Sequence, residues 1–296
     1  MAAFAPSELI LNDQNNIYHL NMGPDDMADK IILVGDPDRV AMVSKLLDSI
    51  QHSSQHREFV MVTGMYKDKR ITVLSTGIGT GNIDIVMNEL DALANIDLVS
   101  RTVKDGHKSL EIVRIGTCGL LQPDVPIHSY IVSQYACGFD NTADFYEVEY
   151  TAAELALNSA FNDHVNMPST LQTYTSASAN SIITKLDSDI VYKGITATSC
   201  GFYGPQGRQL RLKTKCPQLN EELTSFRYHQ PSEGNPLRVL NFEMESSMLF
   251  ALGNALGHQC GTICLGIANR AAGEFSDYTS ITSQMEKMIE YVLDRI

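Results

Sequence analysis

Two arginines follow apolar stretches of the sequence, beside glycines that let a ligand approach the backbone. Arg39 ends the segment Gly35-Asp36-Pro37-Asp38-Arg39, and Arg114 opens Arg114-Ile115-Gly116-Thr117-Cys118-Gly119. A guanidinium, the N–H groups at a helix start and the Thr117 hydroxyl are donors that an oxyanion such as phosphate accepts. Each segment alone is explained equally by a capped helix or a tight turn beside a solvated arginine. Their joint presence in an acidic chain favours an anion pocket.

A third glycine-rich segment, Ser75–Asn82, superficially matches the GxGxxG loop that binds dinucleotides. Asn82 stands where the last glycine belongs, and Asp97 only loosely supplies the acid that such sites place further along. A nicotinamide-dependent dehydrogenase is therefore a weak rival interpretation.

Two glutamates, Glu243 and Glu245, lie where an apolar stretch passes into a helical pattern that runs to Leu256-Gly257. Acidic residues in a first helical turn complement the helix dipole, which is a sufficient structural explanation. A carboxylate also accepts two donors at once, as neighbouring sugar hydroxyls require. The residue types leave both explanations open.

The segment Phe202–Arg208 reads FYGPQGR, and its glycines and proline exclude a regular helix. In an extended backbone Gln206 and Arg208, two residues apart, point to the same side. The glutamine amide offers a donor and an acceptor to the N3–H and carbonyl edge of uracil, Arg208 can donate to that carbonyl, and Phe202 could stack on the ring. An ordinary polar surface turn would have the same composition.

Composition limits the partners that the chain can have. With 22 basic and 35 acidic residues in 296, the net charge of −13 disfavours nucleic acid. No apolar run reaches membrane-spanning length, and the N-terminus lacks the features of a secretory signal, which predicts an intracellular protein that does not bind membranes. Six dispersed cysteines and eight histidines without an HExxH motif predict reduced thiols and no transition metal.

The pattern of apolar residues predicts strands that alternate with helices. The expected strands, each ending near glycine-containing turns, are Ile31–Val34, Ile71–Leu74, Ile112–Ile115, Val239–Phe242 and Thr262–Ile267. Helical stripes follow Pro37, follow Ile83 and span Ile281–Ile296. With no repeat or long linker, we expect one α/β domain whose ligands gather at the carboxyl ends of strands.

In this order the segments GDPDR, HREF, STGIG, RIGTCG, FYGPQGR, FEMES and NR resemble the uridine-cleaving members of the nucleoside phosphorylase-I family, from about Tyr18 onward. The resemblance implies a three-layer α/β/α domain with a central mixed sheet over residues 18–296, after a 1–17 segment that can be flexible. It implies a cytoplasmic pentosyltransferase of pyrimidine salvage that splits uridine with inorganic phosphate, a co-substrate, and needs no cofactor. Active sites would be shared within a homodimer, which could assemble further.

The resemblance also implies roles for individual residues. The implied phosphate ligands are Gly35, Arg39, Arg57, Arg114 and Thr117, with Arg57 coming from the neighbouring subunit. The implied ribose contacts are His19, Met244 and Glu245, with His19 also crossing the interface. The implied base contacts are Phe202, Gln206, Arg208 and, through water, Arg270. Bacterial relatives can hold a monovalent cation near the positions of Glu58 and Ser75.

Several positions depart from the family pattern. Purine-cleaving members carry an aspartate after the last core strand, where this chain reads Gly266-Ile267-Ala268-Asn269-Arg270, so a pyrimidine is favoured. A uracil leaving group spreads its charge over carbonyl oxygens, and an arginine can stabilise it without donating a proton. Pro205 and Cys118 stand where family members often have other residues. These departures leave open the alternative that the chain binds nucleosides with little or no turnover. Lys213–Leu237 matches no motif.

Overall fold

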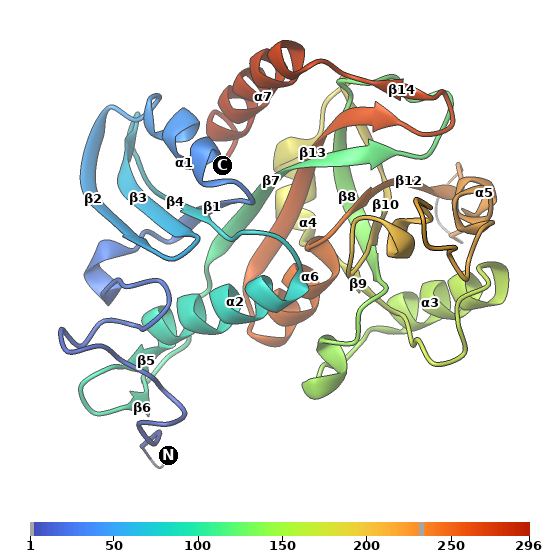
Figure 1. Cartoon of the computed structure of the whole chain (residues 1–296). Helices are drawn as coiled ribbons and strands as arrows, with labels where there is room; N and C mark the ends of the chain where they lie inside the picture. The colour runs from blue at the N-terminus through green and yellow to red at the C-terminus, as the bar shows by residue number, and fades with distance from the viewer. Residues whose placement is uncertain (1–2, 231–233) are drawn as a thin grey trace.

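The computed structural model describes residues 3–230 and 234–296. Within these residues, twelve strands form a mixed sheet through the middle of the molecule (Figure 1). They are β1 (Lys30–Val34), β2 (Ser49–His56), β3 (Phe59–Tyr66), β4 (Lys69–Ser75), β7 (Glu111–Leu120), β8 (Tyr130–Gly138), β9 (Tyr174–Ala177), β10 (Val191–Thr198), β11 (Arg227–Tyr228), β12 (Leu237–Glu243), β13 (Gln259–Asn269) and β14 (Glu274–Phe275). A separate ribbon pairs β5 (Ile96–Asp97) with β6 (Thr102–Val103).

The main path of the sheet runs β11-β12-β10-β8-β13-β7-β1-β4-β3-β2, with β9 beside β8 and β14 beside β13. Strand β1 is parallel to both neighbours, β4 and β7, and β7 is parallel to β13. The far end of β7 also pairs antiparallel with β12, where Phe242 lies opposite Gly119. The carboxyl ends of β1, β7 and β12 are thereby brought close together.

Helices cover both faces of the sheet (Figure 1). They are α1 (Pro37–Ser44), α2 (Thr80–Asn95), α3 (Ala152–His164), α4 (Asn180–Leu186), α5 (Leu219–Ser225), α6 (Ser246–Ala255) and α7 (Tyr278–Leu293), with 3-10 turns η1 (Pro24–Asp26), η2 (Ala143–Phe145) and η3 (Gly204–Gln206). This is the predicted three-layer arrangement around a mixed sheet.

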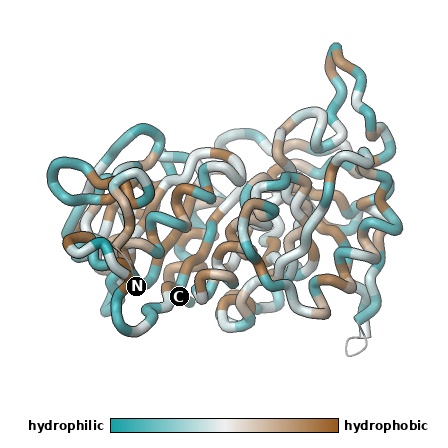
Figure 2. The backbone as a smooth tube through the Cα atoms, turned by 90° about the horizontal axis from the view of Figure 1, so that it is seen from below, coloured by the Kyte–Doolittle hydropathy of each residue, from teal (hydrophilic) through white to brown (hydrophobic). Residues whose placement is uncertain are grey.

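Alternation along β1 shows how the sequence builds the two cores. Ile31 and Leu33 are buried in a cluster with α2 and α6, whereas Ile32 and Val34 pack on the opposite face with α1, α4 and α7. Because successive side chains of a strand point to opposite faces, a strand that is apolar throughout must be covered on both sides. Figure 2 shows the hydrophobic positions concentrated on these inner elements and hydrophilic positions on many outer loops.

The five predicted strands and the three predicted helices are all present. Helix α1 begins at Pro37, and the side chain of the preceding Asp36 caps it by accepting a hydrogen bond from the Asp38 N–H. One local expectation was wrong. Gly116–Gly119 is not a turn of small residues, because β7 continues to Leu120 and pairs with β13 along this stretch.

The N-terminal segment contacts the rest of the domain. Leu9 and Ile17 are buried in the same cluster as α2, and the Arg101 guanidinium donates to the Leu9 carbonyl. Across the described ranges, no helix has both the length and the apolarity needed to cross a lipid bilayer.

Candidate active site

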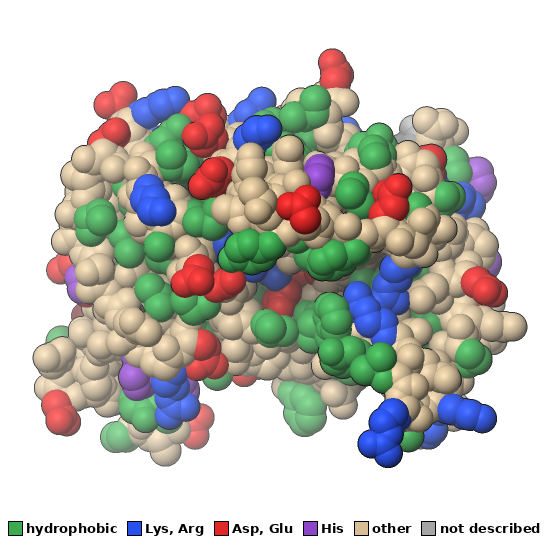
Figure 3. Space-filling view, turned by 45° about the horizontal axis from the view of Figure 1, so that its top comes forward, with side chains coloured by type: hydrophobic (Ala, Val, Ile, Leu, Met, Phe, Trp, Pro, Cys, Tyr) green, Lys and Arg blue, Asp and Glu red, His purple; other side chains and the backbone are tan. Residues whose placement is uncertain are grey.

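A cavity of about 630 Å³ opens where β1, β7 and β12 end. The space-filling view shows charged side chains of both signs at the bottom of a hollow with hydrophobic side chains at its rim (Figure 3). Nine of the predicted site residues line this cavity: Gly35, Arg39, Arg114, Thr117, Phe202, Gln206, Arg208, Met244 and Glu245. Residues that are 210 positions apart in the sequence, such as Gly35 and Glu245, therefore share one space.

A buried ion cluster forms the floor of the cavity. Arg114, Glu243 and Glu245 expose only 4%, 3% and 3% of their surface. The Arg114 guanidinium donates to Glu245 and lies 3.4 Å from Glu243 Oε2. Burial alone would lower the pKa of Arg114, but the two carboxylates outweigh it and raise the pKa above its usual value. Arg114 is therefore a permanent positive charge at this position.

The two glutamates have different roles. Glu243 accepts hydrogen bonds from the Ser246 N–H at 2.9 Å, the Ser246 hydroxyl at 2.8 Å and the Thr198 hydroxyl, so it holds the start of α6. Burial raises its pKa despite the opposing influence of Arg114. Glu243, Met244 and Glu245 all line the cavity. The structural explanation therefore holds for Glu243, and sugar binding by Glu245 stays a prediction.

The loop after β4 also serves Glu245. The Gly79 N–H donates to Glu245 Oε1 at 2.7 Å, and Gly79 has a φ of 97°, a backbone conformation that favours glycine. The glycine-rich segment that resembled a dinucleotide loop therefore directs an N–H group at a carboxylate of the same chain. This contact was missed from the sequence, because it joins segments that carry no shared pattern.

Arg39 provides a second positive charge at the cavity. Its Nη1 donates to the Ile115 carbonyl at 3.1 Å, which holds the guanidinium against β7. Burial, followed by repulsion from Arg114, lowers the pKa of Arg39. Two guanidinium groups that repel each other while facing one cavity favour an anion between them.

The prediction of an extended FYGPQGR segment was wrong. The segment forms the 3-10 turn η3, followed by Gly207 at a φ of 70°. Gln206 and Arg208 still meet, because the Arg208 guanidinium donates to Gln206 Oε1. That guanidinium also lies 3.7 Å from the centre of the Phe202 ring. Arg208 therefore covers the Phe202 ring face that was expected to receive a base.

Arg270 does not line the main cavity but lies directly behind Gln206. It donates to the Gln206 backbone carbonyl, and its Nη2 lies 3.3 Å from Gln206 Oε1. Burial, followed by repulsion from Arg208, lowers the pKa of Arg270 to about 10. Arg270 thus contacts Gln206 directly, and its water-mediated contact with a base stays a prediction.

His19 and Arg57 do not line this cavity. His19 Nδ1 is 2.6 Å from Glu89 Oε1, and the Arg57 guanidinium is 6.0 Å from the ring centre of Tyr18, which packs edge-on against His19. The two residues thus share one exposed region. Their expected contribution to a neighbouring subunit's site stays a prediction.

Glu58 and Ser75, the positions predicted to lie near a monovalent cation, are adjacent. The Ser75 hydroxyl donates to the Glu58 carbonyl at 2.6 Å and accepts from the Val60 N–H at 2.7 Å. The hydroxyl is thus committed to the backbone, and a cation there stays a prediction.

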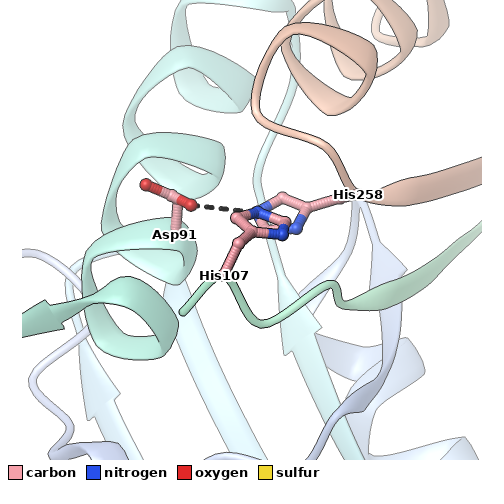
Figure 4. Close-up of side chains that lie close together, drawn as sticks. All are labelled: Asp91, His107 and His258. Carbon is pink, nitrogen blue, oxygen red and sulfur yellow. Dashed lines mark ion pairs between the residues drawn. The ribbon is translucent and has the colours of Figure 1, made fainter. Parts of the chain in front are cut away.

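Asp91, His107 and His258 form a cluster that could be taken for a metal centre (Figure 4). The Leu110 N–H donates to His258 Nδ1 at 3.2 Å, which places the proton of the neutral ring on Nε2. This Nε2 faces Asp91 Oδ1 at 3.3 Å. A metal needs a lone pair on that nitrogen, so the hydrogen bonding fits a histidine–aspartate contact better than a metal centre.

The residues that depart from the family pattern are also placed. Asn269 is buried, and its amide nitrogen donates to the carbonyls of Gln122 and Val125 at 3.0 and 2.8 Å, away from the cavity. Cys118 lines the cavity, and burial raises the pKa of its thiol. Pro205 packs on Gly201 within the η3 region.

Hydrophobic residues of the cavity wall were not predicted as site residues. Ile78, Phe242, Ile267 and Phe275 line the same space, and Ile78 and Phe275 are strongly exposed. Exposed large apolar residues beside a cavity often contact ligands. No sequence pattern marks Phe275, because its strand has only two residues.

Gly116 determines where the Arg114 guanidinium can lie. A Cβ atom at this position would come within 2.2 Å of Arg114 Nη1 and 2.9 Å of Cys264 Sγ. We expect Gly116→Ala to displace the guanidinium and to weaken binding of inorganic phosphate about tenfold, the scale of one charge-assisted hydrogen bond. Calorimetric titration with phosphate measures this. Gly81→Ala, with no atom within 4 Å of the new Cβ, is the matched control. Unchanged affinity in Gly116→Ala would contradict this role.

Known proteins resemble the chain over most of its length. It is 31% identical to a protein from Thermococcus kodakarensis named uridine phosphorylase, over 92% of this chain and 84% of that protein. A purine nucleoside phosphorylase of the DeoD type from Caldanaerobacter subterraneus is 32% identical over only 50% of this chain and 61% of that protein. A solved Trypanosoma brucei nucleoside phosphorylase, described as showing uridine phosphorylase activity, superposes with a TM-score of 0.90 at 29% identity, over 97% of this chain and 99% of that chain.

A family model described as the phosphorylase superfamily matches residues 29–296, which include every element from β1 to α7. The expected fold and the expected family are both confirmed by these similarities. The chain belongs to the phosphorylase superfamily.

Proposed function

We propose that this protein is a uridine phosphorylase, which reversibly converts uridine and phosphate into uracil and ribose 1-phosphate. The observation that carries the proposal is that one cavity contains two guanidinium groups, a buried carboxylate and an amide–guanidinium pair. These are groups that would recognise an anion, a sugar diol and the edge of a pyrimidine, respectively.

The assignments follow the chemistry of each group. Arg39 and Arg114, with Gly35 and Thr117, bind phosphate at the carboxyl end of β1 and along the neighbouring part of β7. Glu245 accepts hydrogen bonds from the ribose hydroxyls, and Met244 lies against the sugar. Gln206 and Arg208 bind the base once Arg208 leaves the Phe202 ring. All of these residues line the cavity.

Catalysis in this proposal is by positioning and electrostatics. As the glycosidic bond loosens, positive charge develops on the sugar, and the bound phosphate stabilises it before attacking C1′ from the opposite face. Arg208 and Gln206 stabilise the negative charge on the departing uracil. No covalent enzyme intermediate forms, and phosphate enters as co-substrate.

Two observations favour a pyrimidine over a purine. The Asn269 amide is committed to backbone carbonyls, so this position provides no acid to protonate a purine. Among relatives that match most of the chain, the uridine phosphorylase from Thermococcus kodakarensis is 31% identical, whereas a purine nucleoside phosphorylase from Oceanobacillus iheyensis is 26% identical over 94% of the chain.

The proposal includes a shared site. His19 and Arg57 would complete the cavity of a neighbouring copy in a homodimer, His19 near the 5′-hydroxyl and Arg57 on phosphate. The six free thiols fit a reducing compartment such as the cytoplasm, where the reaction would serve pyrimidine salvage.

A side-by-side turnover assay tests the proposed reaction. We expect phosphate-dependent cleavage of uridine and much slower cleavage of inosine, with thymidine and deoxyuridine assayed in parallel. Rapid inosine cleavage with inert uridine would overturn the proposal in favour of a purine enzyme. Uridine binding by calorimetry without turnover would overturn it in favour of a nucleoside-binding protein.

Arg208 provides a more specific test. Arg208→Ala removes a charge that stabilises the leaving uracil, so kcat/KM for uridine should fall about tenfold to a thousandfold. Arg211→Ala, an exposed arginine of the same loop, is the matched control and should retain activity. Equal activity of the two variants would remove Arg208 from the mechanism.

A further inference from the structure

Asn220 belongs to the segment that matches no motif, yet it contacts the base-recognition side chains. It lies in the first turn of α5, and Arg270 Nη1 donates to its Oδ1 at 3.2 Å. A Cβ atom added at Gly207 would be 3.1 Å from Asn220 Nδ2, so the amide also packs on the FYGPQGR turn. Asn220 thus touches both Arg270 and the residue after Gln206.

Helix α5, which carries Asn220, is anchored to the core. Leu219 and Leu223 are buried in a hydrophobic cluster with α3 and β12. The Thr224 hydroxyl donates to the Asn220 carbonyl at 2.6 Å and lies 3.1 Å from the Leu121 carbonyl, next to the end of β7. The backbone from which the Asn220 side chain extends is therefore anchored by the core.

Arg270 connects Asn220 to Gln206 through hydrogen bonds to both residues. Its guanidinium contacts Asn220 together with the backbone carbonyl and Oε1 of Gln206. Burial and the neighbouring Arg208 lower its pKa to about 10, which leaves it charged at neutral pH. The charged Arg270 guanidinium is held by the Asn220 side-chain oxygen on one side and by Gln206 on the other, so it has little freedom to rotate.

A hydroxyl fixes the other end of the amide. The Ser199 Oγ donates to a backbone carbonyl, that of Gly201 at 3.2 Å or Glu243 at 3.4 Å, so its lone pair accepts from Gln206 Nε2 at 2.8 Å. Gln206 Oε1 then faces Arg208 and Arg270. One N–H of Gln206 Nε2 remains for a ligand. Its direction depends on the contact of Nε2 with Ser199 and on the contacts of Oε1 with the two arginines.

We propose that Asn220 is a positioning residue for base recognition, acting through Arg270 to orient the Gln206 amide so that its remaining N–H meets a carbonyl oxygen of uracil. This inference rests on the proposed phosphorolysis of uridine. In this proposal, α5 positions the base-binding residues. The pairing of Asn220 with Arg270 then determines affinity for the base rather than for phosphate.

The test compares Asn220→Ala and Asn220→Asp in the full-length protein. Asn220→Ala removes the acceptor for Arg270, so KM for uridine should rise about tenfold, the scale of a hydrogen bond to a charged group. KM for phosphate should stay within about twofold, because Arg39 and Arg114 lie on other elements. Asn220→Asp keeps an acceptor oxygen and should recover KM for uridine to within about threefold of wild type. Gln218→Ala, exposed at the start of the same helix, is the matched control.

The outcomes separate this inference from the proposed function. If the wild type does not cleave uridine, the proposed function fails and this inference fails with it. If the wild type is active, the inference is overturned by unchanged kinetics in Asn220→Ala, by equal effects on both KM values, or by an Asp variant as impaired as the Ala variant. Thermal unfolding of each variant is measured alongside, and a loss of folding in Asn220→Ala leaves Asn220→Asp to decide: near-normal KM for uridine supports the role, and a tenfold rise overturns it.

Discussion

The site depends on one buried charge, the guanidinium of Arg114. Placing an ion in the protein interior is costly unless opposite charges and hydrogen bonds surround it, and here Glu243 and Glu245 provide both. Each glutamate is in turn held by other groups: Glu243 by the start of α6 and by Thr198, and Glu245 by the Gly79 N–H. Two carboxylates around one guanidinium leave an excess negative charge next to the cavity, which Arg39 helps to balance.

The buried cluster of Arg114, Glu243 and Glu245 depends on how β7 pairs with its neighbouring strands. The end of β7 pairs with both β13 and β12, and Arg114 of β7 lies beside Glu243, the last residue of β12, and Glu245, which follows it. In the proposed reaction the same guanidinium faces phosphate while Glu245 faces the ribose, so the two substrates meet groups that already interact. We infer that phosphate and Glu245 compete for Arg114 and that sugar hydroxyls compete with Arg114 for Glu245. Binding of one substrate would then prepare the site for the other.

Much of the fold was predictable because it depends on local patterns. Apolar runs such as Ile31–Val34 must be covered on both faces, and Pro37 and Asp36 mark the start of α1. Small residues were ambiguous, because Gly116–Gly119 fits a turn or a crowded strand equally well, and pairing with β13 decides for the strand. The η3 turn was missed because Gly207 permits a positive φ that residue types alone do not require. The Asn220–Arg270 contact joins residues 50 positions apart and leaves no sequence pattern.

In the proposed reaction, the charge of Arg114 is shared between Glu245 and bound phosphate. The most direct measurement is a calorimetric titration of inorganic phosphate into the wild type and into Glu245→Gln. Removing one negative charge from Arg114, while Glu243 remains, should tighten phosphate binding about tenfold or more, because Coulomb interactions near a buried ion are only weakly screened. Phosphate affinity that is unchanged or weaker in Glu245→Gln would contradict the account.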